Sequence, residues 1–281
     1  METFETVVEL RKHLSTYKRE GKSIGFVPTM GALHEGHLSL IREAKAENDL
    51  VVCSIFVNPI QFNNNTDLEK YPRNIDTDRQ LLIQEDCDVL FFPSEKEVYP
   101  EPVNEQYDFA GLDKVMEGKY RPGHFNGVAI VVKRLFEIVE PTRAYFGLKD
   151  YQQMLIVHKL TKDYNIPVEI IPCPIVREEN GLAMSSRNER LSLAERKQAA
   201  IIYSTLKMVK INSGFSTISE VKSFVARQFK KQKNMKLEYF EIVDMYTLQP
   251  LKTWAQSTTV IACIAVWVGN VRLIDNIILF S

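Results

Sequence analysis

The chain has 281 residues, of which 45% are hydrophobic and 25% are charged, and 35 basic and 36 acidic side chains leave a formal charge of −1. This length allows one large or two modest domains of ordinary globular composition. The balanced charge gives no basic field for nucleic acid, and no run reaches the ~18 apolar residues of a membrane span. Four scattered cysteines and the absence of a signal-peptide pattern favour a reducing compartment, so we expect a cytoplasmic protein.

The first part of the chain has the pattern of alternating helices and strands. Periodic apolar residues predict a helix over 4–20, and a buried strand follows at 24–27. A further helix is expected at 38–47 and a second apolar strand at 50–57. A strand, a helix and a strand within this length form a right-handed βαβ unit. Such sheets bind ligands beyond the carboxyl ends of their strands, so the two following loops should face one site.

The segment 28–37, between the first strand and its helix, concentrates groups that bind anions. The first amides of a helix have no partner inside it, and the helix dipole adds positive charge there. His34 and His37 lie three residues apart and could donate hydrogen bonds to an anion, while Gly31 and Gly36 would let a ligand approach the backbone. Two capping or surface histidines are the structural alternative. The spacing is one residue short of the zinc-hydrolase pattern, which argues against zinc.

Further polar residues follow the later elements. Gln61 lies after the second strand, and its amide can both donate and accept hydrogen bonds. Asp78 lies in an expected helix over 76–86 and could help to hold a metal–ATP complex, although a solvated helix charge is the simpler interpretation. We expect an irregular connection at 93–104 and, at 116–127, a mobile loop that could cover a site. This part also contains a predicted short helix capped by Thr66 and Glu69, and a predicted strand at 89–92.

A second group of polar residues follows a predicted strand at 144–146, which comes after an apolar helix over 128–139. Lys149 can neutralise a triphosphate as a mobile point charge, and Asp150 can accept hydrogen bonds from ribose hydroxyls. A surface Lys–Asp pair at the start of a helix is the alternative. Two serines and an arginine at 185–187 form a plausible phosphate clamp.

The pattern changes in the last part of the chain, and we place a domain boundary near Arg177. Capping boxes predict helices over 192–210 and 217–232. The predicted fold is α/β, with a Rossmann-like doubly wound parallel sheet in residues 1–176 and a smaller α+β domain in residues 177–281. The second domain has no obvious catalytic cluster and is expected to form a lid over a nucleotide. Its strands are predicted at 237–244, 258–268 and 270–278, with antiparallel pairing.

Six motifs, in this order, resemble those of one family. They are PTMGALHEGHLSL at 28–40, FVNPIQF at 56–62, YPR at 71–73, RPGHFNGV at 121–128, FGLKDYQQ at 146–153 and MSSRN at 184–188. The first resembles the H-x-G-H signature of the nucleotidyltransferases that include class I aminoacyl-tRNA synthetases, and the last resembles their K-M-S-K-S signature. Together, over most of the chain, they resemble the pantothenate synthetase (pantoate–β-alanine ligase) family. The chain departs from that pattern at Ile130, where we expect a packing change, and at Leu148, where a backbone contact would survive.

The resemblance implies an ATP-dependent ligase that condenses pantoate with β-alanine on the route to coenzyme A. Pantoate would attack the α-phosphate of ATP to give pantoyl-adenylate and pyrophosphate, and the amine of β-alanine would then form pantothenate and release AMP. Mg²⁺ would bind on the ATP phosphates, with Asp78 as a candidate protein ligand, and the protein would be a homodimer. No nucleic acid and no membrane would be partners.

The same resemblance assigns roles to residues. His37, with an unperturbed pKa of ~6.5, would be the proton donor; His34 and Lys149 would also be catalytic. Gln61 and Gln153 would bind pantoate, and Gln61 would also bind β-alanine. The ATP-binding residues would be Met30, Gly31, Ala32, Leu33, His34, Glu35, Gly36, His37, Gly147, Leu148, Lys149, Asp150, Val176, Met184, Ser185, Ser186 and Arg187.

Two other functions stay open. Another adenylyl or cytidylyl transferase of the same superfamily would attach the nucleotide to its product and would not release AMP with an amide. The family motifs that contain Gln61 and Gln153 argue against this alternative. A non-enzymatic nucleotide-binding regulator on the same scaffold should lack one or more of the charged groups, all of which are present in this chain.

Overall fold

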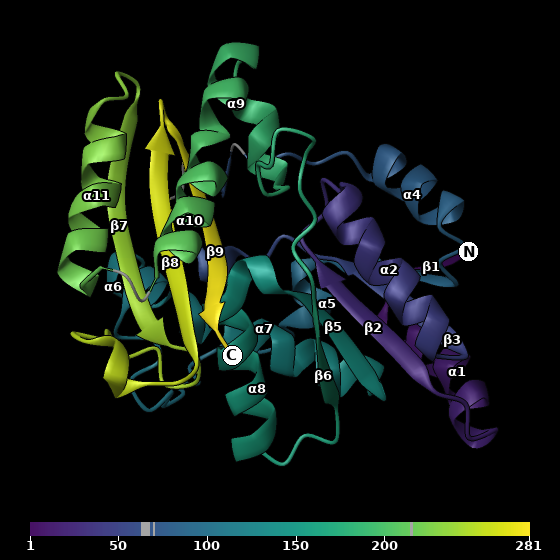
Figure 1. The fold of residues 1–281 in the computed structure, drawn as a ribbon. Coiled ribbons are helices and arrows are strands. Elements are labelled where there is room, and N and C mark those ends of the chain that lie inside the picture. The colour runs from purple at the N-terminus through teal and green to yellow at the C-terminus, as the bar shows by residue number, and fades with distance from the viewer. Residues whose placement is uncertain (63–67, 70, 214–215) are drawn as a thin grey trace.

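Two sheets organise the protein, one of six parallel strands and one of three antiparallel strands (Figure 1). The structure is a computed structural model and describes residues 1–62, 68–69, 71–213 and 216–281. The capping pair expected at Thr66 and Glu69 lies partly outside these residues. Among the helices that are described, none is both long and apolar enough to cross a membrane. The α/β class predicted from the sequence is confirmed.

The large sheet has the strand order β1-β4-β3-β2-β5-β6 with parallel pairing throughout. Its strands are β1 (Glu2–Phe4), β2 (Ile24–Thr29), β3 (Leu50–Ile55), β4 (Val89–Phe91), β5 (Arg143–Gly147) and β6 (Glu169–Cys173). The chain moves outward from β2 through β3 to β4, and then returns to place β5 on the other side of β2. The carboxyl ends of β2 and β5 are therefore the topological switch point, where open α/β sheets bind ligands.

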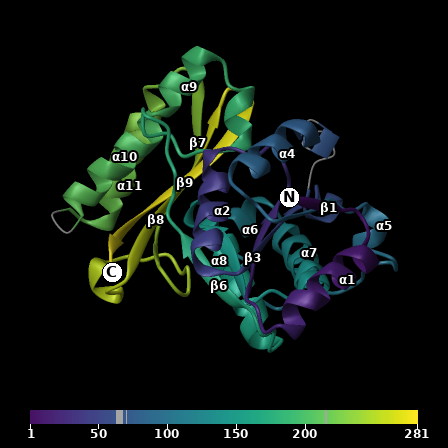
Figure 2. The same cartoon turned by 90° about the vertical axis from the view of Figure 1, so that its right-hand side faces the viewer.

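Helices cover both faces of this sheet (Figures 1 and 2). Neighbouring residues of a strand point to opposite faces. Phe26 of β2 accordingly packs in one buried cluster with Leu14 and Val132, whereas Val27 packs in another with Ile41 and Leu82. The first cluster contains residues of α1 (Val7–Arg19), α7 (His124–Val139) and α8 (Tyr151–Asp163), and the second contains residues of α2 (Glu35–Glu47) and α4 (Ile75–Gln84).

Three parts of this region differ from the prediction. The helix predicted over 4–20 begins at Val7, with Thr6 as its cap, because residues 2–4 form the short edge strand β1 instead. The connection at 93–104 contains the short helix α5 (Glu95–Val98). The expected mobile loop at 116–127 is wrong, since α6 (Met116–Tyr120) and the start of α7 occupy it and Glu117 and His124 are buried there.

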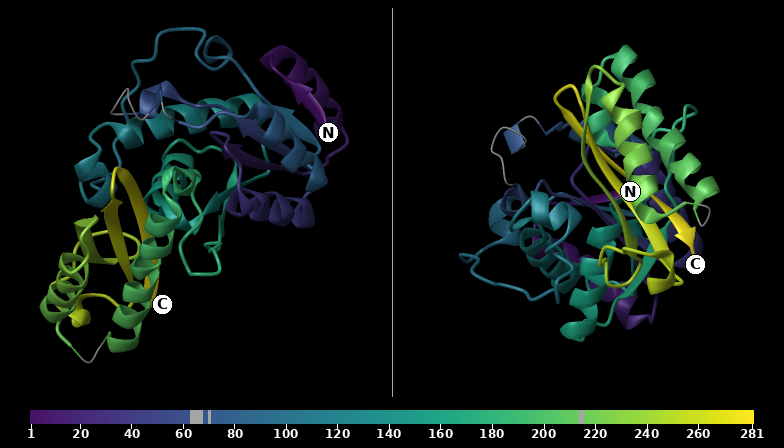
Figure 3. Two further views of the ribbon diagram at one scale, coloured as in Figure 1. Left: turned by 90° about the horizontal axis from the view of Figure 1, so that it is seen from above. Right: turned by 60° about the vertical axis from the view of Figure 1, so that its left-hand side comes forward.

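The last part of the chain, residues 177–281, forms the small sheet and its helices (Figure 3). We call it the second region, and residues 1–176 the first region. The antiparallel order β7-β8-β9 confirms the predicted pairing. Capping boxes at Ser192 and Thr217 are present as predicted, but the single helix expected over 192–210 is interrupted at Ala200. The elements are α9 (Leu193–Ala199), α10 (Ile201–Asn212), α11 (Ile218–Lys230), β7 (Met235–Asp244), β8 (Val260–Val268) and β9 (Val271–Phe280).

The small sheet is apolar on both faces. Ala262 and Ile264 of β8 pack in a buried cluster with residues of α10 and α11. Cys263 and Ala265, at the alternate positions, belong to the same buried cluster as α1, α7 and α8 of the first region. The small sheet therefore completes the larger core as well as its own. The domain boundary near Arg177 and the role of the second region as a lid stay predictions.

Candidate active site

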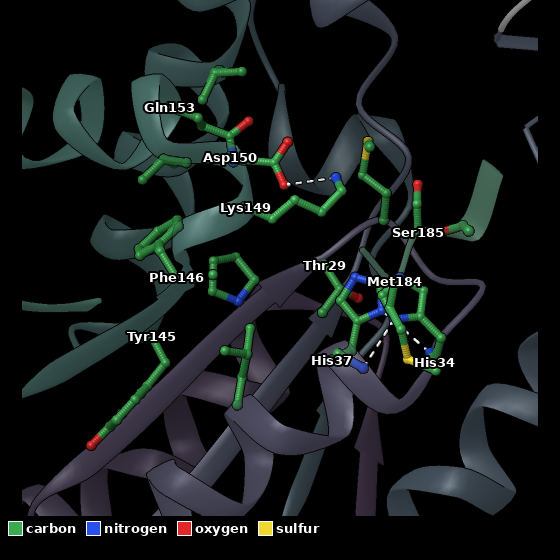
Figure 4. A pocket seen from close by; sticks show the side chains of 18 of the residues that line it. Thr29, His34, His37, Tyr145, Phe146, Lys149, Asp150, Gln153, Met184 and Ser185 are labelled. Carbon is green, nitrogen blue, oxygen red and sulfur yellow. Dashed lines mark hydrogen bonds and ion pairs between the residues drawn. The ribbon is translucent and has the colours of Figure 1, made fainter. Parts of the chain in front are cut away.

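The switch point between β2 and β5 opens into a cleft of about 210 Å³ (Figure 4). Each of the six sequence motifs contributes to its lining, including YPR through Tyr71 and RPGHFNGV through Val128. The structure thus brings together segments that lie more than 100 residues apart in the sequence. The predicted site residues that line the cleft are Met30, His34, Gly36, His37, Gln61, Gly147, Lys149, Asp150, Gln153, Val176, Met184, Ser185, Ser186 and Arg187.

The two histidines form a pair at the start of α2, which begins three residues earlier than predicted. His34 is the N-cap, and its Nδ1 accepts a hydrogen bond from the amide of Gly36 at 3.1 Å. Nδ1 of His37 accepts from the amide of His34 at 3.4 Å, and the ring centroids are 4.0 Å apart. Because both Nδ1 atoms are acceptors, each neutral ring carries its proton on Nε2. The capping interpretation is therefore confirmed for both histidines, and anion binding through the Nε2–H groups stays a prediction.

Two backbone amides at the start of α2, where we expected free donors for an anion, are bonded within the protein instead. The amide of Gly36 is bonded to the ring of His34, and the amide of His37 donates to the carbonyl of His34 at 2.7 Å. Gly36 makes room for that ring, since a Cβ there would lie 2.9 Å from Cε1 of His34. The helix start therefore offers imidazole N–H groups to the cleft.

Both imidazoles are neutral in the free protein at neutral pH. Burial, and then the charge of Lys149, lower the pKa of His34 to about 4. Burial, followed by the neighbouring His34 and Lys149, holds the pKa of His37 well below its usual 6.5. The expectation of an unperturbed His37 is therefore wrong for the free protein, because it omitted the groups that the fold places beside the ring. A bound polyanion would favour the protonated rings and raise both pKa values.

Asp78 shapes the turn before α2. Its side chain is buried, and its two oxygens accept from the amides of Ala32 at 2.8 Å and Leu33 at 2.7 Å. Burial raises the pKa of Asp78, and these two hydrogen bonds oppose the rise. The interpretation as a solvated helix charge is wrong. Within the described part of the chain, no three His, Cys, Asp or Glu side chains gather as a metal-holding group.

Five residues predicted to bind ATP lie outside the lining of the cleft: Gly31, Ala32, Leu33, Glu35 and Leu148. The amides of Ala32 and Leu33 are bonded to Asp78, and exposed Glu35 pairs with Arg42. The side chain of Leu148 packs against the main core. These five residues therefore lie outside the surface that faces the cleft, and their contacts with ATP stay predictions.

Lys149 and Asp150 enter the cleft from the end of β5, where η2 (Leu148–Asp150) leads into α8. Nζ of Lys149 lies 3.3 Å from Oδ2 of Asp150, and Figure 4 shows both side chains on the side of the cleft opposite the histidines. Asn276 of β9 donates hydrogen bonds to the carbonyls of Leu148 and Lys149. Sequence analysis missed Asn276, because its partners lie more than 120 residues away in the sequence.

Gln61 is held by a network that sequence analysis also missed. Nδ2 of buried Asn58 donates to Oε1 of Gln61 at 3.2 Å, and the hydroxyl of Tyr99 donates to Oδ1 of Asn58 at 2.8 Å. Nδ1 of His124 lies 2.9 Å from the carbonyl oxygen of Gln61. A Cβ at Gly127 would come within 2.8 Å of Cα of Gln61, so only glycine permits this approach. The FVNPIQF motif contains Asn58, three residues before Gln61, but only Gln61 was singled out in it as a site residue.

The segment 184–187 borders the cleft from the second region. An antiparallel bridge between Arg177 and Ala183 leads into it, and the amide of Met184 donates to the carbonyl of Val176 at 3.0 Å. Oγ of Ser185 accepts from the amide of Arg187 at 3.3 Å and caps η3 (Ser186–Arg190). Figure 4 shows Met184 beside the histidine pair, with Ser185 next to it.

The cleft is thus surrounded by donors of different kinds. Two neutral imidazoles, an ammonium, two hydroxyls and a guanidinium line it together with the amide side chains of Gln61 and Gln153. Such donors suit a phosphorylated ligand, because each can hydrogen-bond to phosphate oxygens and the cations also neutralise their charge. The amide side chains suit hydroxyl and carboxylate groups.

Comparison with known proteins points to one family at each level. The family model described as pantoate-beta-alanine ligase matches residues 2–278. Pantothenate synthetase of Bacteroides fragilis is 50% identical over 277 residues, which are 99% of this chain and 98% of that protein. A crystal structure of pantothenate synthetase from Thermus thermophilus matches with a TM-score of 0.93 at 42% identity, covering 100% of both chains. Pantoate-beta-alanine ligase from Francisella tularensis, complexed with beta-gamma ATP and beta-alanine, matches with a TM-score of 0.83 at 38% identity and covers 99% of this chain and 97% of that one.

Proposed function

Since this chain belongs to the pantoate-beta-alanine ligase family, we propose that the cleft between β2 and β5 condenses pantoate with β-alanine in a reaction driven by ATP. The observation that carries the proposal is that all six motifs of the sequence contribute residues to this one cleft. The relative from Francisella tularensis, complexed with beta-gamma ATP and beta-alanine, supports the choice of substrates.

We propose that the reaction passes through an acyl-adenylate. A carboxylate and an amine do not condense in water, since they persist as an ion pair. In the first step a carboxylate oxygen of pantoate attacks the α-phosphorus of ATP, the bond to the bridging oxygen breaks, and pyrophosphate leaves. In the second step the neutral amine of β-alanine attacks the acyl carbon. The bond to AMP then breaks, the nitrogen loses a proton, and pantothenate remains.

The donors of the cleft fit the charge that develops in the first step. Negative charge spreads over phosphate oxygens, so fixed positive and N–H donors lower the barrier. We assign this role to His34, His37 and Lys149. His37 would donate a hydrogen bond from Nε2 as a neutral ring, and a bound polyphosphate would raise its pKa toward the range of a proton donor.

The remaining residues are assigned to substrate binding. Ser185, Ser186 and Arg187 would hold phosphate oxygens from the side of the second region. Gln61 and Gln153 would bind pantoate, and Gln61 would also contact β-alanine. The network of Asn58 and His124 around Gln61 supports this assignment, because it holds Gln61 before any ligand arrives.

Mg²⁺ is proposed to enter with ATP as part of the substrate. Asp78 fits poorly as its ligand, because both carboxylate oxygens already accept hydrogen bonds from backbone amides. Phosphate oxygens and water would supply most of the octahedral ligands. When bound, the ion neutralises part of the phosphate charge. The homodimer and the cytoplasmic location stay predictions from the sequence.

The first experiment is a product assay with purified protein, ATP, Mg²⁺ and pantoate, with and without β-alanine. We expect AMP, pyrophosphate and pantothenate in equal amounts only when both substrates are present. Pantoate without β-alanine should support exchange of labelled pyrophosphate into ATP. In the complete reaction, ¹⁸O from the pantoate carboxylate should appear in AMP. Turnover without AMP, or indifference to pantoate, would favour another nucleotidyltransferase. Tight ATP binding without any turnover would favour a regulator.

A further inference from the structure

An asparagine of the second region reaches the loop that carries Lys149. Asn276 of β9 is 6% exposed, and its Nδ2 donates hydrogen bonds to the carbonyls of Leu148 at 2.8 Å and of Lys149 at 3.0 Å. These carbonyls belong to the two peptide groups on either side of Cα of Lys149. Because peptide groups are planar, fixing both carbonyls fixes the backbone dihedrals of Lys149 and the direction of its Cα–Cβ bond.

Asn276 is itself held by an ion pair between buried Asp275 and partly buried Arg177. Oδ1 of Asp275 accepts from the amide of Asn276 at 2.8 Å. Arg177 donates to the two carboxylate oxygens of Asp275 at 2.7 and 2.9 Å, in the bidentate geometry that restricts orientation most strongly. The guanidinium of Arg177 also lies 3.6 Å from the ring centre of Tyr203 and donates to the carbonyl of Gly181 at 3.1 Å. This arginine is therefore fixed from several sides.

The same arginine anchors the other phosphate-binding segment. Arg177 forms the antiparallel bridge with Ala183, directly before the segment 184–187. The chain of contacts thus runs from this segment through Arg177, Asp275 and Asn276 to the backbone of Lys149. It connects two groups of proposed phosphate ligands that come from different regions of the fold.

We propose that Asn276 is a positioning residue for Lys149. In this proposal the Arg177–Asp275 ion pair holds Asn276 in a fixed position relative to the segment 184–187. The inference rests on the proposed role of Lys149 at the phosphates of ATP. Asn276 lies outside the described lining of the main cleft, so it acts through the backbone of η2. A purely structural role would also join the two regions, but it would not depend on the ammonium group of Lys149.

The test is a double-mutant cycle with Asn276→Ala, Lys149→Ala and the combined variant, measured as kcat and KM for ATP and for pantoate. We expect Asn276→Ala to lower kcat/KM for ATP roughly tenfold, because two hydrogen bonds to the backbone are lost. KM for pantoate should change less than twofold. In the Lys149→Ala background the same substitution should have less than a twofold effect, because no ammonium remains to be positioned.

A matched control separates positioning from general stability. Val225→Ala truncates a fully buried side chain of α11 in the same region, far from η2 in the sequence. It should lower the melting temperature yet leave kcat/KM for ATP within twofold at a temperature where the variant is folded. If Asn276→Ala does not fold, as judged by circular dichroism, Asn276→Ser takes its place in the cycle with the same expected pattern.

Three results would contradict the proposal, and they can be told apart. An equal loss in both backgrounds would leave Asn276 with a structural role only. A normal Asn276 variant beside an impaired Lys149→Ala enzyme would overturn this inference and leave the proposed function intact. An unimpaired Lys149→Ala enzyme would overturn this inference together with the proposed role of Lys149 in ATP binding, while the proposed ligase activity would stand.

Discussion

Two polar clusters of this chain differ in how completely their groups are satisfied by one another. Between α6 and β9, Arg272 donates to both carboxylate oxygens of Glu117 at 2.7 Å, and the hydroxyl of Tyr239 donates to the same carboxylate at 2.8 Å. At the start of α2, by contrast, the rings of His34 and His37 hydrogen-bond only through Nδ1 to the residues that the structure describes. The first cluster is closed and holds the fold together, whereas the second leaves donors for a ligand.

The two clusters also differ in charge state, because Glu117 is ionised whereas His34 is neutral. Burial by itself would raise the pKa of Glu117, but the hydrogen bonds and charge of Arg272 outweigh it and lower the pKa to about 2. Burial and the charge of Lys149 lower the pKa of His34 to about 4, so this ring gives up its charge. The closed cluster keeps its charges because they are paired. The open cluster is neutral in the free protein, and perturbed pKa values of this kind are common at functional sites.

The largest effect should come from opening the closed cluster. Arg272→Ala would leave the buried Glu117 carboxylate without its bidentate partner, with only the hydroxyl of Tyr239 and the more distant Arg121 beside it. Removing one partner of a buried ion pair typically costs ~3–5 kcal/mol of stability. Urea unfolding followed by tryptophan fluorescence measures this loss, since Trp254 and Trp267 both lie in the second region. A loss below ~1 kcal/mol would show that the cluster contributes as little as an exposed ion pair.

Acid should open the same cluster. The folded pKa of Glu117, about 2, lies below its usual 4.5, so its contribution to stability is fully present above 4.5 and is lost as pH falls toward 2. Between these values, the free energy of unfolding should therefore fall more steeply for the wild type than for Glu117→Gln. Equal slopes in urea titrations across this window would contradict the paired state of Glu117.

The open cluster should respond through activity and not through stability. We expect His37→Ala to lower kcat by ~10²-fold or more, because a donor to the reacting phosphate is lost. The free energy of unfolding should change little. His158→Ala, at an exposed position of α8, is the matched control and should keep turnover within twofold. Near-normal turnover of the His37 variant would remove this residue from the mechanism.

Asp78 combines features of both clusters. Both of its carboxylate oxygens accept hydrogen bonds within the protein, as in the closed cluster, but the turn that it supports leads into the open cluster. In Asp78→Asn the side-chain NH2 would face a backbone amide donor, and one buried amide would lose its acceptor, at ~1–3 kcal/mol. We expect KM for ATP to rise along with the loss of stability. Asp76→Asn, exposed in the same turn of α4, should stay within ~0.5 kcal/mol in unfolding experiments. Equal effects at the two positions would mean that burial of Asp78 is unimportant.

The smallest effect should come from a charge pair that is close but exposed. Nζ of Lys18 lies 2.8 Å from Oε2 of Glu140, nearly the same distance as in the closed cluster. Exposed pairs contribute only ~0–1 kcal/mol, because water screens them. Lys18→Ala should therefore change the free energy of unfolding by that amount at most. A loss comparable to that of Arg272→Ala would show that proximity, and not burial, decides the strength of these pairs.

Features that depend on residues close together in the sequence could be predicted, whereas contacts between residues far apart in the sequence could not. The strands around β2, the capping boxes at Ser192 and Thr217 and the motif residues of the cleft were predicted, because each is marked by a local pattern. Glu117 and Arg272 are 155 residues apart, and Asn276 is 128 residues from Leu148.

No local period reveals such partners, so α6 was mistaken for a mobile loop and Asn276 was missed. The lowered pKa of His37 was missed for the same reason, since it arises first from burial by the folded chain and then from the neighbouring His34 and from Lys149 of another motif.

The two-faced small sheet has a consequence for how the protein is made. Strand β8 supplies alternate side chains to the core around α7 and α8 as well as to its own helices. A ribosome synthesises the first region well before β8. An apolar face of the nascent first region therefore stays exposed until β8 has been made. We expect it to depend on chaperones during that interval, and a prematurely terminated copy should be removed by proteolysis instead of persisting as a nucleotide-binding fragment.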